Sequence, residues 1–179
     1  MRGALAGRGR LPRYAGFHPR PDPPRTPRGR RIATLFGVTV LRVRFAETDQ
    51  MGVAHHAAYV VWLEAARVEW MRERGLSYRA LEDEGVSMAV ASLEVTYRAA
   101  ARFDDELTIH TRLAALKSRF GRFRYLVEGP NGDIVAHATS DHIATNREGR
   151  AIRLPRAWHD TLAMHLETDA GNEHQRTTP

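Results

Sequence analysis

The chain has 179 residues, a formal net charge of +6 and no cysteine. A chain of this length predicts a single domain, and the lack of cysteine excludes disulfide bonds, thiolate zinc sites and a cysteine nucleophile. No apolar run reaches the roughly 18 residues that a membrane-spanning helix needs, so we expect a cytoplasmic protein with no membrane span.

The positive charge is concentrated near the N-terminus. Residues 1–37 hold nine arginines against one acid, Asp22, and carry +8, whereas the remainder carries −2. Because the remainder is nearly neutral, we expect no nucleic-acid partner. Residues 1–37 are rich in Arg, Pro and Gly, lack a periodic apolar pattern, and are predicted to be a disordered extension. Three explanations stay open: an inert segment, a natural translation start near Val38, or a contact arm for RNA or another polyanion.

Residues 38–166 are predicted to form the folded domain. Apolar residues that alternate with Arg42 and Arg44 indicate a first strand over about 38–46. After the polar turn ETDQMG, apolar residues recur at helical spacing over about 57–74, and Gly75 ends this helix. Its apolar residues cover more than one side, so we expect a buried central helix.

The remainder of the domain is predicted to be mostly strands. Ser77 caps a short helix that runs to about Glu84, and four strands follow over about 86–101, 105–117, 119–129 and 133–145. The sequence PNGD favours a two-residue hairpin turn with positive φ at Asn131 and Gly132. A last helix is predicted over about 155–166, and residues 167–179 form a frayed polar C-terminus. One long helix with antiparallel strands is an α+β fold.

Asp49 lies between the first strand and the central helix. Asp49 and Gly52 have the spacing of an Asx-type turn, which by itself explains both residues. The turn also brings a carboxylate to a helix start near His56, where unpaired backbone N–H groups and the helix dipole stabilise a developing oxyanion. A carboxylate that attacks a polarised carbonyl, or deprotonates water beside it, is the minimal equipment for acyl-transfer hydrolysis.

The segment around Asp49 resembles a known family. Its pattern is an aromatic residue, a Thr-Asp pair, and Gly, His and Tyr three, seven and ten residues after the Asp: Phe45, Thr48, Asp49, Gly52, His56 and Tyr59. With WLEAARVEWMRERGLSY and YRAAARFDDEL, it resembles the hot-dog-fold thioesterases of the 4-hydroxybenzoyl-CoA thioesterase type, especially the bacterial short-chain acyl-CoA thioesterases associated with the Tol-Pal cluster. The resemblance covers about residues 38–160, although Ala100 stands where the family has Pro. It implies an antiparallel sheet of about five strands wrapped around one long central helix.

The resemblance also implies a reaction and its residues. The expected activity is hydrolysis of acyl-CoA thioesters to free acid and CoA, without a cofactor. Asp49 is the implied catalytic carboxylate, as nucleophile or as general base, and a backbone N–H at about His56 polarises the thioester carbonyl. The His56 side chain is either catalytic or a packing or capping residue. Tyr59 is implied to shape the acyl pocket.

Further residues are assigned supporting roles in substrate binding. We place Gly52, Glu64, Arg98 and Arg102 in this group and expect Glu64 to pair with Arg67, three residues on. Basic side chains are expected at the pocket mouth, where they bind the CoA phosphates; the candidates are Arg98, Arg102, Lys117, Arg119 and Arg122. Asp49 with His55 and His56 does not have the spacing of a metal site, so no metal is expected.

The family works as dimers that pair into tetramers, with the site at a subunit interface, so we expect a homo-oligomer, by resemblance a homotetramer. Two other functions stay open. One is a non-catalytic acyl-CoA-binding module of hot-dog shape. The other is hydratase or dehydratase chemistry on the same fold.

Overall fold

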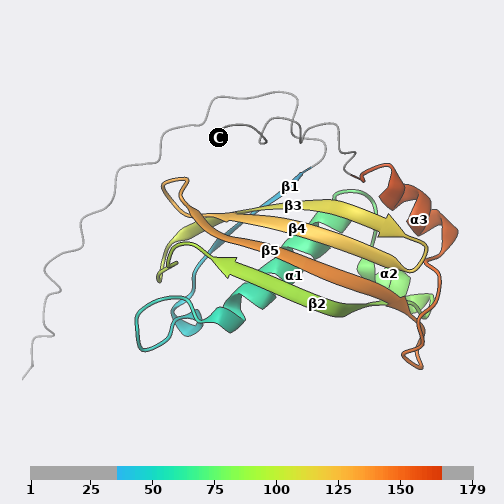
Figure 1. Ribbon diagram of the computed structural model, residues 1–179, viewed down its shortest axis with the longest axis horizontal. Helices are drawn as coiled ribbons and strands as arrows, with labels where there is room; N and C mark the ends of the chain where they lie inside the picture. The colour runs from blue at the N-terminus through green and yellow to red at the C-terminus, as the bar shows by residue number, and fades with distance from the viewer. Residues whose placement is uncertain (1–35, 167–179) are drawn as a thin grey trace, which may run out of the picture.

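The computed structural model describes residues 36–166 (Figure 1). The predicted extension over 1–37 and the polar C-terminus over 167–179 lie outside this range, apart from Phe36 and Gly37. Gly37 already belongs to the first strand, one residue before the predicted domain start. The domain boundaries beyond this stay predictions.

Five strands form one antiparallel sheet in the order β1-β3-β4-β5-β2. Their bounds are Gly37–Arg42 (β1), Ser87–Tyr97 (β2), Glu106–Lys117 (β3), Phe120–Glu128 (β4) and Ile134–Thr145 (β5). The four later strands confirm the predicted ones to within a few residues. The first strand ends at Arg42 and not near 46, because the chain turns into a short 3-10 helix over Phe45–Glu47. Along β3 the alternate residues are buried, as the period of two predicts: Leu107, Ile109, Thr111 and Leu113.

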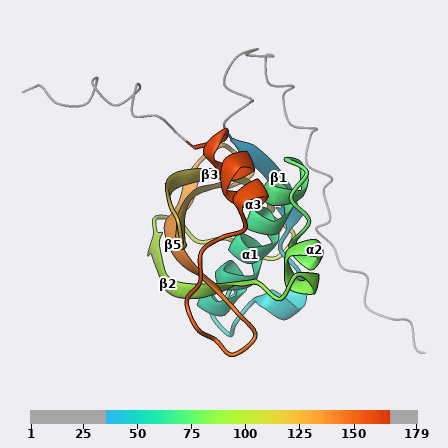
Figure 2. The ribbon, with the colours of Figure 1, turned by 90° about the vertical axis from the view of Figure 1, so that its right-hand side faces the viewer.

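Helix α1, His56–Arg72, lies in the concave side of the curved sheet (Figure 2). The predicted central helix is therefore confirmed. Helix α2, Tyr78–Asp83, is capped by the Ser77 hydroxyl as expected, and α3, Arg156–Ala163, covers one end of the sheet. None of these helices, which are the helices of residues 36–166, is long and apolar enough to cross a membrane.

The turn between β4 and β5 differs from the prediction. Gly129 O accepts a hydrogen bond from Gly132 N at 3.0 Å, and Gly129 N donates to Asp133 O at 2.8 Å. Gly132 has φ +78°, but Asn131 is not among the residues with positive φ. The predicted two-residue turn needs residue 130 to donate its N–H to Asp133 O, but Pro130 has no N–H, so Gly129 makes this bond and the loop has one residue more.

A polar chain crosses the core between α1 and the sheet. Tyr125 Oη and Ser140 Oγ are 2.9 Å apart, and Ser140 Oγ lies 2.8 Å from His142 Nε2. Burial raises the pKa of Tyr125 to about 12. Burial, followed by the charge of Arg67, lowers the pKa of His142 to about 4. Both groups are therefore neutral at pH 7 and serve as core hydrogen-bonding groups.

Candidate active site

Asp49 lies in a closed loop between the 3-10 helix and α1. Thr48 and Ala54 form an antiparallel bridge at the base of the loop. Inside it, Asp49 N donates to Val53 O and Gly52 N donates to Asp49 O, both at 2.9 Å. Gly52 has φ +71°, a conformation that favours glycine. The loop geometry is therefore specified by its own sequence.

The two oxygen atoms of the Asp49 carboxylate have different surroundings. Oδ1 accepts a hydrogen bond from Met51 N at 2.8 Å, so the predicted Asx turn is present. Oδ2 makes no hydrogen bond or ion pair with any other residue of 36–166. The side chain is half-buried. The turn thus holds the carboxylate in place and leaves one oxygen available to a substrate or water.

The start of α1 follows this loop directly. His55, to which the sequence assigned no role, is the N-cap: its Nδ1 accepts from Ala57 N at 3.2 Å. His56 is the first helical residue, its side chain is exposed, and its backbone N–H makes no hydrogen bond to another described residue. The backbone N–H at His56 is therefore a donor without a partner among residues 36–166, and it lies at the helix start, where the dipole is positive.

Glu47 joins the Asp49 loop to α1, a role that the sequence analysis missed. Its Oε1 accepts from Trp62 Nε1 at 3.0 Å, and its Oε2 accepts from Arg44 N at 2.8 Å. Its backbone oxygen accepts from His55 N at 2.7 Å. Partial burial raises the pKa of Glu47, but the hydrogen bonds from Arg44 and Trp62 outweigh it and hold the pKa below its ordinary value. Glu47 is therefore a charged clamp across both ends of the loop.

The segment between β2 and β3 lies beside the same loop. Ala54 N donates to Ala101 O at 2.8 Å, and Arg102 Nη1 lies 3.4 Å from Gly52 O. Arg102 N in turn donates to Asp105 Oδ2 at 2.8 Å. The structure therefore places Arg102, a predicted site residue, against the turn that carries Asp49.

Tyr59 lies one turn into α1 and is buried. Its ring packs 4.8 Å from Trp62 and 4.9 Å, edge to face, from Tyr97 at the end of β2. Burial, with a smaller effect of Tyr97, raises the pKa of Tyr59. In the single chain Tyr59 is therefore a packing residue between α1 and the end of β2.

Two other predicted site residues, Glu64 and Arg98, make no side-chain contact with the Asp49 loop among the interactions of residues 36–166. Glu64 is exposed on α1 and forms no ion pair within residues 36–166. The predicted pairing with Arg67 is wrong, because Arg67 turns into the core and lies over the Tyr78 ring at 5.2 Å. Arg98 is exposed just after β2 and is fixed through its backbone, which donates to Val135 O at 2.8 Å.

The predicted cluster of phosphate-binding side chains is also not formed within one chain. Lys117 and Arg119 lie at the β3–β4 turn, at the end of β3 next to α3, whereas the Asp49 loop is at the other end of the sheet (Figure 1). Arg122 is engaged by Asp141, with Nε–Oδ1 at 2.6 Å and Nη2–Oδ2 at 2.8 Å. The hydrogen bond from Arg122 is the main cause that lowers the pKa of Asp141.

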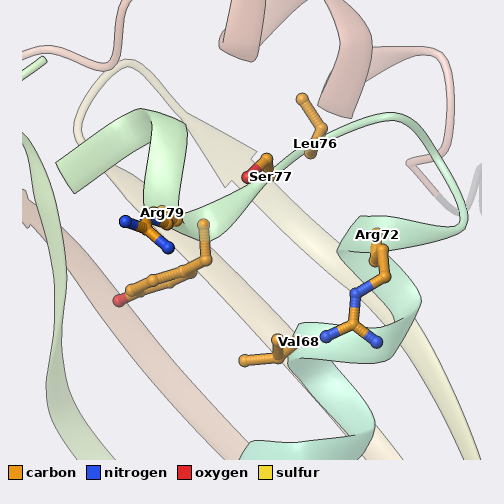
Figure 3. Close-up of a pocket in the computed structure, with 6 residues that line it drawn as sticks. Val68, Arg72, Leu76, Ser77 and Arg79 are labelled. Atoms are coloured by element: carbon orange, nitrogen blue, oxygen red, sulfur yellow. The ribbon is translucent and has the colours of Figure 1, made fainter. Parts of the chain in front are cut away.

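A cavity of about 280 Å³ lies between α1 and α2. Figure 3 shows Arg72 of α1 and Arg79 of α2 on two sides of it, and Val68 is part of its lining. Arg72 is already paired with Glu69. Asp49 does not line this cavity, so it is not an acyl pocket for the Asp49 site within one chain.

Comparison with known proteins places this geometry in a family. The profile of the Thioesterase-like superfamily matches residues 43–166. The Bacillus subtilis protein named "Putative acyl-CoA thioesterase YneP" is 31% identical over 121 residues, which are 67% of this chain and 88% of YneP. The Escherichia coli acyl-CoA thioester hydrolase YbgC is 42% identical over 84 residues, which are 47% of this chain and 62% of YbgC.

Among solved structures, the DHNA-CoA thioesterase from Staphylococcus aureus is 26% identical with a TM-score of 0.70, covering 72% of this chain and 89% of that one. The finer assignment to the Tol-Pal-associated branch stays a prediction. The sheet order and the central helix agree with the family match over residues 43–166. The chain belongs to the Thioesterase-like superfamily, and its five-stranded sheet around α1 is a hot-dog fold.

Proposed function

We propose that the protein hydrolyses acyl-CoA thioesters to free acid and CoA, with Asp49 as the catalytic carboxylate. The observation that carries the proposal is the loop before α1, in which Asp49 Oδ1 is fixed by Met51 N while Oδ2 has no partner within the described residues. The names of YneP and YbgC support the acyl-CoA substrate class. This arrangement provides a positioned carboxylate in the loop that leads into α1, whose first N–H, at His56, has no partner among residues 36–166.

The reaction needs a polarised carbonyl and an oxygen nucleophile. The thioester oxygen accepts from the His56 N–H, where negative charge develops as the carbonyl carbon is attacked. In one route Asp49 takes a proton from water and the resulting hydroxide attacks. In the other, Asp49 attacks directly and water then hydrolyses the anhydride. Both routes break the C–S bond and release CoA thiolate, and general-base catalysis contributes about 10²–10⁴ in rate.

The remaining site residues have supporting roles in this proposal. Arg102 stands against the Gly52 carbonyl and, with Arg98 on the same end of the sheet, offers positive charge for the CoA phosphates. Tyr59, which packs against Tyr97, limits the acyl pocket. The exposed His56 imidazole is free to contact substrate.

We further propose that the protein is a homo-oligomer, a dimer or a tetramer. Strand β2 is the last strand of the sheet and pairs only with β5 among the described strands, so one of its edges is open. Val60 and Val61 on α1 and Val90 on β2 are exposed by 46%, 55% and 60%. A second copy would cover these residues and lie next to Glu64, which gives Glu64 a role across the interface. Light scattering coupled to gel filtration tests this, and a monomer at assay concentration would contradict it.

The function is tested with a panel of acyl-CoA substrates and a thiol reagent. Because the chain has no cysteine, the thiol signal reports released CoA alone. Release of free CoA from at least one acyl-CoA supports hydrolysis. Binding with the ligand left intact would indicate the non-catalytic binding module, and a changed acyl group with the thioester intact would indicate hydratase or dehydratase chemistry. A cytoplasmic location is part of this proposal and follows from the composition only.

A further inference from the structure

Two exposed phenylalanines lie on the segments that flank the Asp49 loop. Phe45 begins the 3-10 helix that precedes Asp49 and is 77% exposed, and Phe103, in the segment between β2 and β3, is 56% exposed. Their rings contact each other edge to face, with centroids 5.7 Å apart. One exposed apolar side chain is ordinary, but two exposed rings in contact form an apolar patch, and such a patch favours a binding surface. We call Phe45 and Phe103 the aromatic pair.

The backbone holds the aromatic pair in place. Val43 N donates to Asp105 O at 2.9 Å and Asp104 N donates to Val43 O at 3.0 Å, which ties the segment before the 3-10 helix to the turn that carries the second ring. Asp104 has φ +69°, and no other non-glycine residue of 36–166 has a positive φ. Arg42 Nη1 donates to Asp104 O at 2.8 Å and stabilises this turn. The chain thus holds an uncommon backbone conformation next to an exposed ring, which is typical of segments that contact a ligand.

The aromatic pair is connected to the Asp49 loop on both sides. Phe45 O accepts from Thr48 Oγ1 at 2.8 Å, directly before Asp49. Arg102, which precedes the second ring, places Nη1 3.4 Å from Gly52 O. A substrate whose reacting carbon lies at Asp49 therefore has the two rings on segments that border its binding site.

We propose that the aromatic pair binds the aliphatic chain of the acyl group, which makes Phe45 and Phe103 specificity-determining residues. This inference rests on the proposed thioesterase function. The pantetheine arm of CoA carries amides that need hydrogen-bond partners, and phenylalanine rings offer none, whereas an alkyl chain needs only apolar contact. Met51, which is 77% exposed within the Asp49 loop, adds to the apolar surface. We therefore expect a preference for acyl chains of several carbons over acetyl.

The test compares acetyl-, butyryl-, hexanoyl- and octanoyl-CoA as substrates. Each added CH₂ group that contacts the aromatic pair should raise kcat/KM about twofold, which corresponds to half of the free energy of full burial. We expect Phe45→Ser and Phe103→Ser to lower this factor toward one, whereas Phe103→Leu keeps an apolar side chain and should retain most of it. Met164→Ser is the control, because Met164 is 73% exposed just after α3, at the other end of the sheet from the Asp49 loop (Figure 1). Thermal unfolding verifies that each variant is folded.

A binding arm separates this inference from the proposed activity. The Kd of the same four acyl-CoAs is measured by calorimetry on the Asp49→Asn protein, where it should fall about twofold with each CH₂ group. Adding Phe103→Ser should remove this trend. If the wild type hydrolyses no acyl-CoA but the trend in Kd depends on the aromatic pair, the proposed reaction fails and the acyl-binding inference stands.

Three outcomes would overturn the inference. The first is a wild type with no trend in kcat/KM or Kd along the acyl series, or Phe45→Ser and Phe103→Ser variants that keep the wild-type trend. The second is a changed association state of either variant in light scattering coupled to gel filtration, which would assign the aromatic pair to an interface with a second copy. The third is binding to phosphatidylcholine vesicles by the wild type but not by the variants, which would assign it to a lipid surface.

Discussion

The clamp formed by Glu47 gives a prediction that links stability to the site. Glu47→Gln removes the negative charge but keeps a carbonyl that accepts from Trp62 Nε1, now 3.0 Å from Glu47 Oε1. A hydrogen bond to a charged group contributes about 1.5–3 kcal/mol and a neutral one about 1 kcal/mol, so we expect a loss of about 1 kcal/mol in the free energy of unfolding. Glu47→Leu leaves the Trp62 N–H buried without an acceptor, and here the expected loss is about 1–3 kcal/mol.

The sign of the pH dependence follows from the lowered pKa of Glu47. A carboxyl whose pKa is lower in the folded state stabilises the fold above its unfolded pKa, and this stabilisation is lost as the pH falls through the folded value. The stability difference between wild type and Glu47→Gln should therefore be full at pH 7 and disappear in acid, below the ordinary value of 4.5. Urea unfolding at several pH values measures it.

A double-mutant cycle of Glu47→Leu with Trp62→Phe isolates the hydrogen bond, because each substitution removes it. We expect a coupling of about 1 kcal/mol between the two, and additivity within about 0.3–0.5 kcal/mol would refute the clamp. Glu47→Leu loses the side-chain bonds to Arg44 and Trp62 that hold residue 47 in place. Because Glu47 O accepts from His55 N at 2.7 Å, a shift of the residue 47 backbone should move the Asp49 loop. At a temperature where the variant is folded, kcat/KM for thioester hydrolysis should fall about tenfold. Unchanged kcat/KM would show that the clamp does not position the loop.

Three further substitutions probe the loop and the frame around it. Gly52→Ala forces alanine to φ +71°, with Arg102 Nη1 4.0 Å from its Cβ. We expect the free energy of unfolding, measured with urea, to fall by about 1–2 kcal/mol and kcat to fall as well, and a wild-type kcat would contradict the loop geometry. Gly37→Ala places a Cβ 2.7 Å from Trp70 Cδ1 and should lower the thermal stability by about 1–3 kcal/mol, whereas an unchanged melting temperature would show that Trp70 yields freely. Ser77→Ala removes the hydroxyl that caps α2. It should lower the free energy of unfolding, measured with urea, by about 1 kcal/mol without changing kcat, and a loss of kcat would contradict a purely structural role for Ser77.

The secondary structure was readable from the sequence where the signal was local. Period-two alternation in β3, helical spacing in α1 and the Ser77 cap each act within a few residues, and the structure confirms all three. The prediction of a two-residue turn at Asn131 and Gly132 was wrong because it followed the preference of Asn-Gly for such turns and did not consider that Pro130 has no N–H for the closing pair.

The site was readable only in part, because much of it depends on contacts between distant segments. The Asx turn of Asp49 is local and was predicted. The hydrogen bond between Glu47 and Trp62 joins residues 15 positions apart, which no spacing rule reveals. Arg67 was expected to pair with Glu64 on the helix surface, but burial of its guanidinium over Tyr78 depends on how α1 packs. In the sequence, Glu47 and Trp62 are two separate residues with no pattern that relates them.

The most direct test of the account is the thioesterase activity of Asp49→Asn. Asparagine keeps the side-chain oxygen that accepts from Met51 N at 2.8 Å, so the loop should retain its turn and the protein its unfolding transition. The amide is neither a base nor a nucleophile, and CoA release should fall by at least about 10²-fold. Wild-type rates of CoA release from a folded Asp49→Asn protein would contradict the assignment of Asp49 as the catalytic carboxylate.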